Sequence, residues 1–137
     1  MNNLKVMRLI DGTTLLAEVI AHTASFLVHN PIEYMVEGDT TMAKPFLPGA
    51  EDDAWLIPSA QIVAISKPTE FFAKFYGSAL YKMFVQAAVH KLHLSGMEEF
   101  DDTTKNALES KKMEIYSKFG LMDEQEFLNS FESRVKH

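Results

Sequence analysis

The sequence predicts a mainly β fold with α-helices after the strands: a five-stranded, strongly bent antiparallel barrel followed by C-terminal helices. Three observations carry this prediction. An Asp11-Gly12 pair joins two apolar runs near the N-terminus, which is a strong hairpin signal. Short strand-like segments separated by turn residues continue to Ser66. From Pro68-Thr69 onward, the apolar residues follow helical spacing instead.

The strand-like segments are separated by Gly, Pro and Asn. Gly12 accepts the positive φ that a tight hairpin turn requires, so the first two runs should pair. The third run is interrupted at Asn30-Pro31, because Pro donates no ladder hydrogen bond and is tolerated only at edges and bulges. We expect about five strands, drawn from residues 4–10, 14–21, 25–36 and 40–46 and from the closing segments 54–57 and 61–66.

Three helices are expected after the strands. The first covers residues 69–94 and should pack on the barrel through Phe71, Phe75 and Met83. Gly77 lies inside it and lowers helix propensity by roughly 1 kcal/mol, which packing must offset. The second covers 103–119 and ends at Gly120, and the third covers 123–135, opening with a capping-box spacing.

The chain of 137 residues is expected to form a β domain over residues 1–68 and a helical extension over 69–137. Its net charge is −6. The first part holds four basic and eight acidic residues, and the second holds nine basic and eleven acidic residues. Neither part has the basic excess that supplies most nonspecific affinity for nucleic acid.

The chain contains no Cys, which excludes disulfides, thiolate nucleophiles and Cys-ligated metal sites. This agrees with a reducing cytoplasm. The N-terminal residues lack the basic lead and apolar run of a signal peptide, and no stretch approaches the ~18 uncharged apolar residues of a membrane span. We therefore expect a cytoplasmic protein that does not enter a membrane.

No motif of a catalytic or cofactor site is present. The sequence has no Gly-rich phosphate loop and no nucleophile elbow. His90 and His93 share a helix face, but nothing at matching spacing supplies the further ligands of a zinc site. The acidic run 51–53 lacks the Gly spacing of a calcium loop and is expected to be a solvated loop. We expect a nonenzymatic protein without metal or cofactor.

Two motifs resemble those of the Sm-like family, which includes the bacterial host-factor branch. The run ending in Asp11-Gly12 matches the first hairpin, with Ala17 where the family has a Gly. Ungapped, the acidic position falls on Thr23 and the Asn position on Leu27, whereas a loop two residues shorter places Ser25 there. The family's base-contacting Asn is absent in either alignment.

The second motif in the family is Ile-Arg-Gly followed by spaced aliphatic residues. Here the three aliphatic positions are Ile57, Ile62 and Ile65, and Pro58-Ser59 replaces Arg-Gly. The resemblance covers residues 4–66, and helices after the barrel are similar to those of divergent, phage-type Sm-like proteins. An unrelated SH3-like or OB barrel has the same number of strands.

The resemblance implies a homo-oligomeric ring joined through edge strands, expected at residues 40–46 and 61–66, and RNA or single-stranded DNA as ligand. The candidate contact residues are His22, Thr23, Ser25, Pro58 and Ser59. The alternative is a phage structural or protein-interaction module that keeps the scaffold without recognising nucleic acid. In either case, the C-terminal helices are a candidate surface for a protein partner.

Overall fold

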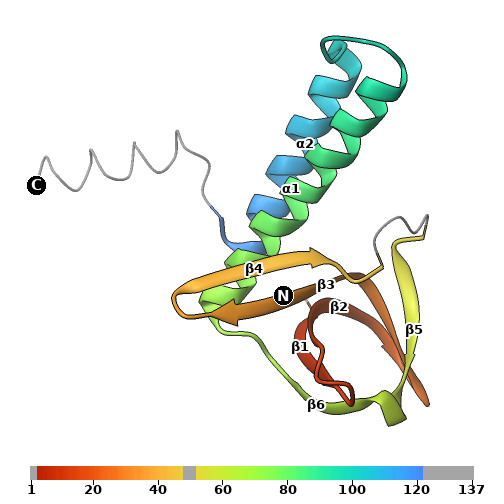
Figure 1. Ribbon diagram of the computed structural model, residues 1–137, viewed down its shortest axis with the longest axis vertical. Helices are drawn as coiled ribbons and strands as arrows, with labels where there is room; N and C mark the ends of the chain where they lie inside the picture. Colours follow the sequence, from red (N-terminus) through yellow and green to blue (C-terminus); the bar gives the residue numbers. More distant parts are fainter. Residues whose placement is uncertain (1–2, 48–51, 122–137) are drawn as a thin grey trace, which may run out of the picture. The chain divides into compact units, whose positions relative to one another are not determined.

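The computed structural model describes residues 3–47 and 52–121, which contain six β-strands, a short 3-10 turn and two α-helices (Figure 1). The chain divides into two compact units, residues 1–76 and the residues from 77 onward. The division falls within the first helix, so its opening turns belong to the first unit and its remainder to the second. The mainly antiparallel β architecture with helices after it is confirmed.

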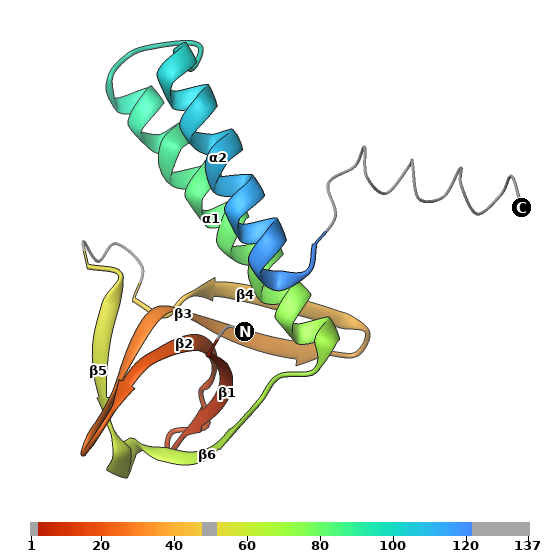
Figure 2. The same ribbon diagram turned by 180° about the vertical axis from the view of Figure 1, so that it is seen from behind.

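The sheet of the first unit has the strand order β4-β3-β2-β1-β6, with β5 paired to β3 beside this path. Every pairing is antiparallel. Figures 1 and 2 show the strands curving around a common interior. The strands are β1 (Leu4–Leu9), β2 (Thr14–His22), β3 (Ser25–Glu37), β4 (Thr40–Pro45), β5 (Ala54–Pro58) and β6 (Ile62–Ser66).

The described residues contain six strands, where the sequence suggested about five. The difference arises after Pro58, where the 3-10 turn η1 (Ser59–Gln61) separates two strands. Before the turn, β5 pairs with β3; after it, β6 pairs with β1. The two closing segments expected from the sequence, 54–57 and 61–66, therefore pair with different neighbours.

The predicted hairpin at Asp11-Gly12 is confirmed. Arg8 and Thr14 are the last paired residues before the turn, and Gly12 takes a φ of 89°. The Thr13 N–H donates to Asp11 Oδ1 at 2.9 Å, and the same bond lowers the pKa of the Asp11 carboxyl. Asp11 thus supplies an acceptor for a backbone N–H of the turn, and Gly12 supplies the positive φ that the turn requires.

The interior of the first unit is an apolar cluster drawn from four strands. Its buried members are Met7, Leu9, Leu15, Ala17, Val28 and Ile57. Leu16 and Ile32 are paired residues of β2 and β3 and are 0% and 1% exposed, although they point away from the Leu15 side of the sheet. Both faces of β2 are therefore buried at its centre.

Strand β3 changes its partner at Asn30-Pro31. Residues 25–29 pair with β5, and residues 32–37 pair with β4. Asn30 is the only non-glycine residue with a positive φ (47°) in the described part of the chain, and Asn tolerates this conformation better than most residues. The interruption expected at this dipeptide is thus a bend within one long strand.

The first helix, α1 (Glu70–Leu94), begins where the sequence predicts. The Thr69 hydroxyl accepts a hydrogen bond from the Phe72 N–H at 3.3 Å, which satisfies one free donor of the first turn. The Phe72 ring packs against Tyr34 of β3, with ring centroids 5.1 Å apart. These contacts fix the opening turns of α1 on the β3 side of the first unit.

The expected packing of Phe71 is wrong, because its side chain is 63% exposed. The buried aromatic side chain is that of Tyr76, which is 0% exposed and donates a hydrogen bond to the Asn30 carbonyl at 3.0 Å. A buried hydroxyl needs a partner, and the bend in β3 provides a carbonyl for it. This requirement sets the rotation of the helix and turns Phe71 outward.

In the second unit, the rest of α1 lies antiparallel to α2 (Asp102–Phe119), as both ribbon views show (Figures 1 and 2). The predicted second helix is thereby confirmed. A Cβ on Gly77 would lie 2.9 Å from Phe119 Cβ and 2.9 Å from Leu121 Cδ1. Gly77 therefore permits a close approach between the two helices, which explains a glycine inside a helix.

Both ends of α2 are capped, and its end at Gly120 is the one that the sequence predicts. Asp101 Oδ1 accepts from the Thr104 N–H at 2.7 Å, and this bond lowers the pKa of Asp101. Gly120 has a φ of 73°, and the Leu121 N–H donates to the Tyr116 carbonyl. The third predicted helix, 123–135, lies outside the described residues. No helix in the described part of the chain is long and apolar enough to cross a membrane.

We predict that Tyr76→Phe lowers the free energy of unfolding by about 0.5–1.5 kcal/mol at neutral pH, because the bond to Asn30 is lost. Burial, and to a lesser degree the charge of Glu18, raise the pKa of Tyr76 above the ordinary 10.0. Above pH 10 the unfolded chain therefore loses this proton first, and stability falls by up to about 1.4 kcal/mol per pH unit.

Denaturant unfolding between pH 7 and pH 11 measures this slope. Tyr76→Phe should flatten the alkaline part of the profile, since Phe cannot ionise. The control Tyr116→Phe retains Tyr76 and should keep the alkaline dependence of the wild type. Identical slopes for wild type and Tyr76→Phe would contradict the burial of the Tyr76 hydroxyl in solution.

Candidate nucleic-acid interface

The five candidate residues lie at two chain reversals that meet. The turn between β2 and β3 carries His22, Thr23 and Ser25, and the passage from β5 into η1 carries Pro58 and Ser59. Ser25 and Pro58 are paired residues of β3 and β5. The Ser59 N–H donates to the Ala24 carbonyl at 3.1 Å. We call residues 22–25 and 58–59 the corner.

His22 supplies an aromatic surface at the corner. Its imidazole stacks on the Phe26 ring, with centroids 3.8 Å apart and an angle of 13° between the planes. Phe26 packs against the apolar interior, whereas His22 is exposed. One face of the imidazole is therefore supported from below. A flat, supported and exposed ring is a suitable surface for a stacked base.

Backbone groups of the corner are hydrogen-bonded to one another. The Thr23 N–H donates to the Ser25 carbonyl at 3.0 Å, which closes the turn. The Ser59 hydroxyl oxygen is buried and has no hydrogen-bond partner within the described structure. The corner is thus held by backbone bonds, and its short side chains offer few donors for reading base edges.

The corner lacks local charge. Residues 21–28 and 55–62, which form it and its flanking strands, contain no Lys, Arg, Asp or Glu. Phosphate contacts usually supply most of the affinity for nucleic acid. Any attraction of phosphates to this surface must therefore come from residues outside these segments.

Sequence reasoning missed a polar cluster at the bend of β3. His29 Nε2 lies 3.2 Å from Asp53 Oδ2, and the Asn30 N–H donates to the Asp53 carbonyl at 2.7 Å. On the other side of the bend, the Phe46 N–H donates to the Pro31 carbonyl at 3.1 Å. The bend made by the positive φ of Asn30 brings Asp53 and Phe46 to the same part of β3. In the sequence, only the Asn30-Pro31 dipeptide indicated this bend.

This cluster is a structural clasp. It fixes the end of β4 and the start of β5 against the same bend. Within the described residues, no group of three or more His, Cys, Asp or Glu side chains is placed to hold a metal ion. His90 and His93 lie on exposed positions of α1.

No protein-family model matches the sequence, and a search of curated proteins finds no match either.

We predict that Ser59→Ala leaves the stability unchanged or raises it, by up to ~1 kcal/mol, because the substitution removes a buried hydroxyl without a partner. Thermal unfolding followed by circular dichroism measures the change. Ser66→Ala, at an exposed position of β6, is the matched control. A loss clearly larger than that of the control would show that the Ser59 hydroxyl has a partner in solution.

Proposed function

We propose that the protein is a nonenzymatic, Sm-like module that assembles with copies of itself through the open edges of its sheet. The observation that carries this proposal is the strand arrangement. β4 and β5 each pair only with β3, and β6 pairs only with β1, within the described chain. The sheet therefore presents two different open edges, and unpaired strand edges are templates for pairing with another chain.

Each of these edge strands exposes an apolar side chain, although β4 ends in Lys44-Pro45 and β5 in Pro58. Met42 of β4, Leu56 of β5 and Val63 of β6 are 46%, 69% and 63% exposed. Single-chain proteins commonly protect strand edges with charges or Pro. β6 carries neither, since its sequence is IVAIS. Such an edge is better explained by a partner strand than by permanent contact with water.

The fold features support an Sm-like reading of this assembly. The hairpin at Asp11-Gly12, the bent third strand and the aliphatic last strand follow the order of that family. A strand pairing between two different edges is heterologous, and repeated heterologous contacts close into a ring when the rotation between subunits permits. A closed ring leaves no subunit with a free edge, so we propose a ring-shaped homo-oligomer.

Light scattering at micromolar concentration tests the assembly. The wild type should have a mass of several subunits, and Leu56→Lys or Val63→Lys should reduce it, because burying an unpaired charge at the contact is unfavourable. Ile20→Lys is the control: Ile20 is 56% exposed but lies at the irregularity of β2 between Val19 and Ala21, outside β4, β5 and β6. A monomeric wild type would refute the proposal.

A second candidate function is weak binding of RNA or single-stranded DNA at the corner, favoured by the supported imidazole of His22. The corner segments carry no charge, so phosphate attraction would rest on scattered side chains such as Lys5, Arg8 and Lys44, summed over several subunits. The −6 net charge of each chain opposes it. Contacts this few should lose most of their affinity between low and physiological salt.

Titration of labelled single-stranded RNA and DNA at two salt concentrations tests this candidate. We expect weak binding at low salt that His22→Ala reduces and His90→Ala leaves unchanged, since His90 belongs to α1 in the second unit and is not part of the corner. Tight, salt-resistant binding unaffected by His22→Ala would place the site on another surface. No binding at low salt would leave the protein-interaction module as the function.

A further inference from the structure

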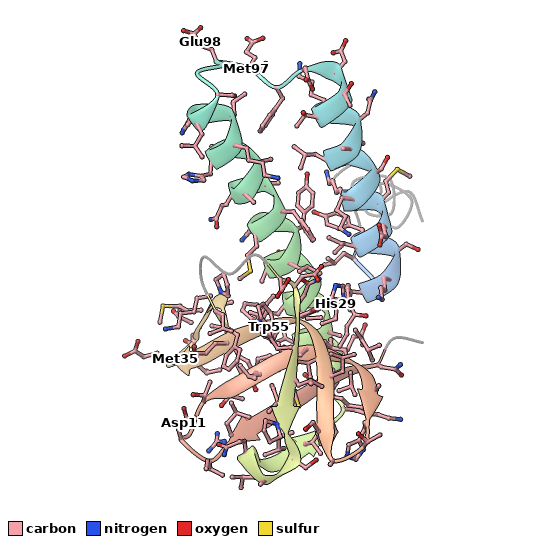
Figure 3. The ribbon with its side chains drawn as sticks, turned by 90° about the vertical axis from the view of Figure 1, so that its right-hand side faces the viewer. Asp11, His29, Met35, Trp55, Met97 and Glu98 are labelled. Carbon is pink, nitrogen blue, oxygen red and sulfur yellow. The ribbon has the colours of Figure 1, made fainter. Side chains whose placement is uncertain are left out.

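A groove runs between the two helices of the second unit. It encloses about 590 Å³, which lies within the ~300–1,000 Å³ range of small-molecule pockets. The C-terminal half of α1 and the N-terminal half of α2 form its walls, and Met97, in the connection between the helices, lies at one end (Figure 3). The apolar side chains of the walls are Phe84, Ala87, Ala88, Leu92, Ala107 and Leu108.

Small side chains leave the space of this groove open. Ala87 and Ala107, one from each helix, are exposed, whereas the larger side chains of Leu92 and Leu108 are half-buried. From Phe84 onward, the groove follows α1 for eleven residues, or about 16 Å at a rise of ~1.5 Å per residue. Burial of an apolar ligand of this length against the walls would be favourable.

Two lysines, Lys91 of α1 and Lys111 of α2, bring positive charge into the groove. Lys111 Nζ lies 4.6 Å from the centroid of the Phe84 ring, so Lys111 is level with a residue seven positions before Lys91. Helical side chains lean toward the N-terminus of their helix, and the two helices are antiparallel. The two lysines therefore lean toward the same stretch of the groove.

Both ammonium groups can accept an anionic partner. Within residues 3–47 and 52–121, Lys91 takes part in no ion pair, and the only ion pair of Lys111 is with Glu114, at 3.8 Å. An exposed pair of this kind contributes little. The stretch between the two lysines is thus the part of the groove that best suits a negative charge.

The opposite end of the groove carries the opposite charge. Asp101 lines the groove beside Phe100, next to the connection between the helices. The hydrogen bond from the Thr104 N–H lowers the pKa of Asp101, so its carboxyl is ionised at neutral pH. A negative group of a ligand is therefore disfavoured at this end, whereas an apolar end can pack against Phe100 and Met97.

We propose that the groove binds a single-chain amphiphile with a carboxylate head, a free fatty acid of medium length. The carboxylate lies between Lys91 and Lys111, where charge-assisted hydrogen bonds reach it from both walls. The alkyl chain extends along Leu92 and Leu108 toward Phe100. This inference depends neither on the assembly of the sheet edges nor on the corner.

Isothermal titration calorimetry of the full-length chain with decanoate tests this site, and decanol is the uncharged probe of the same chain length. We expect both to bind. Lys91→Gln/Lys111→Gln should weaken decanoate binding about tenfold and leave decanol within about twofold of the wild type, because only decanoate forms charge-assisted bonds. The matched control Lys82→Gln/Lys105→Gln removes the same charge from exposed positions outside the groove and should change neither affinity.

A bulky side chain in the groove gives a second test. Ala107→Trp should abolish the binding of both probes, because the indole occupies the space of the alkyl chain. The control Asn106→Trp, at an exposed position outside the groove, should retain both, and circular dichroism checks that each variant keeps its helices. Absence of decanoate binding to the wild type, or binding that Ala107→Trp leaves intact, would overturn the proposal. Equal weakening of decanoate and decanol by the lysine substitutions would also overturn it.

Vesicles of phosphatidylglycerol distinguish a free amphiphile from a lipid bilayer. We expect the chain to remain in the supernatant when such vesicles are sedimented. Cosedimentation that Ala107→Trp abolishes would assign the groove to a membrane lipid and would overturn the proposal of a free fatty acid.

Discussion

The bend at Asn30-Pro31 holds the first unit together. A single strand would ordinarily have one neighbour on each side, but here the positive φ of Asn30 lets β3 pair with β5 before the bend and with β4 after it. The carbonyl of Asn30 faces the buried hydroxyl of Tyr76, and its N–H faces Asp53. Two strand pairings and the rotation of a helix thus depend on the conformation of one residue.

Much of this architecture could be predicted because its signals are local. Gly12, Thr69 and Gly120 each determine the conformation of residues next to them in the sequence. The hairpin, the start of α1 and the end of α2 therefore follow from the sequence. The exposure of Phe71 and the burial of Tyr76 could not be predicted in the same way. Helical spacing identifies an aromatic stripe, but only the distant Asn30 carbonyl decides which ring is buried.

The candidate site could likewise be predicted only in part from the sequence. The resemblance placed the five candidates on two segments, and the register of β3 against β5 brings those segments together at Ser25 and Pro58. The stacking of His22 on Phe26 and the unpartnered hydroxyl of Ser59 have no signature in the sequence, because both depend on how the two turns meet. The clasp between His29 and Asp53 spans 24 residues and was equally inaccessible.

The same clasp determines where the chain tolerates changes in length. Phe46 and Asp53 are each hydrogen-bonded to the bend of β3, so both ends of the segment 46–53 are fixed. Met35 in the other half of β3 is 56% exposed and projects from the sheet (Figure 3). Because the free energy of closing a loop grows only slowly with its length, inserted residues between Phe46 and Asp53 would leave the strand register intact. Natural variation in length, or an engineered epitope, is best accommodated there.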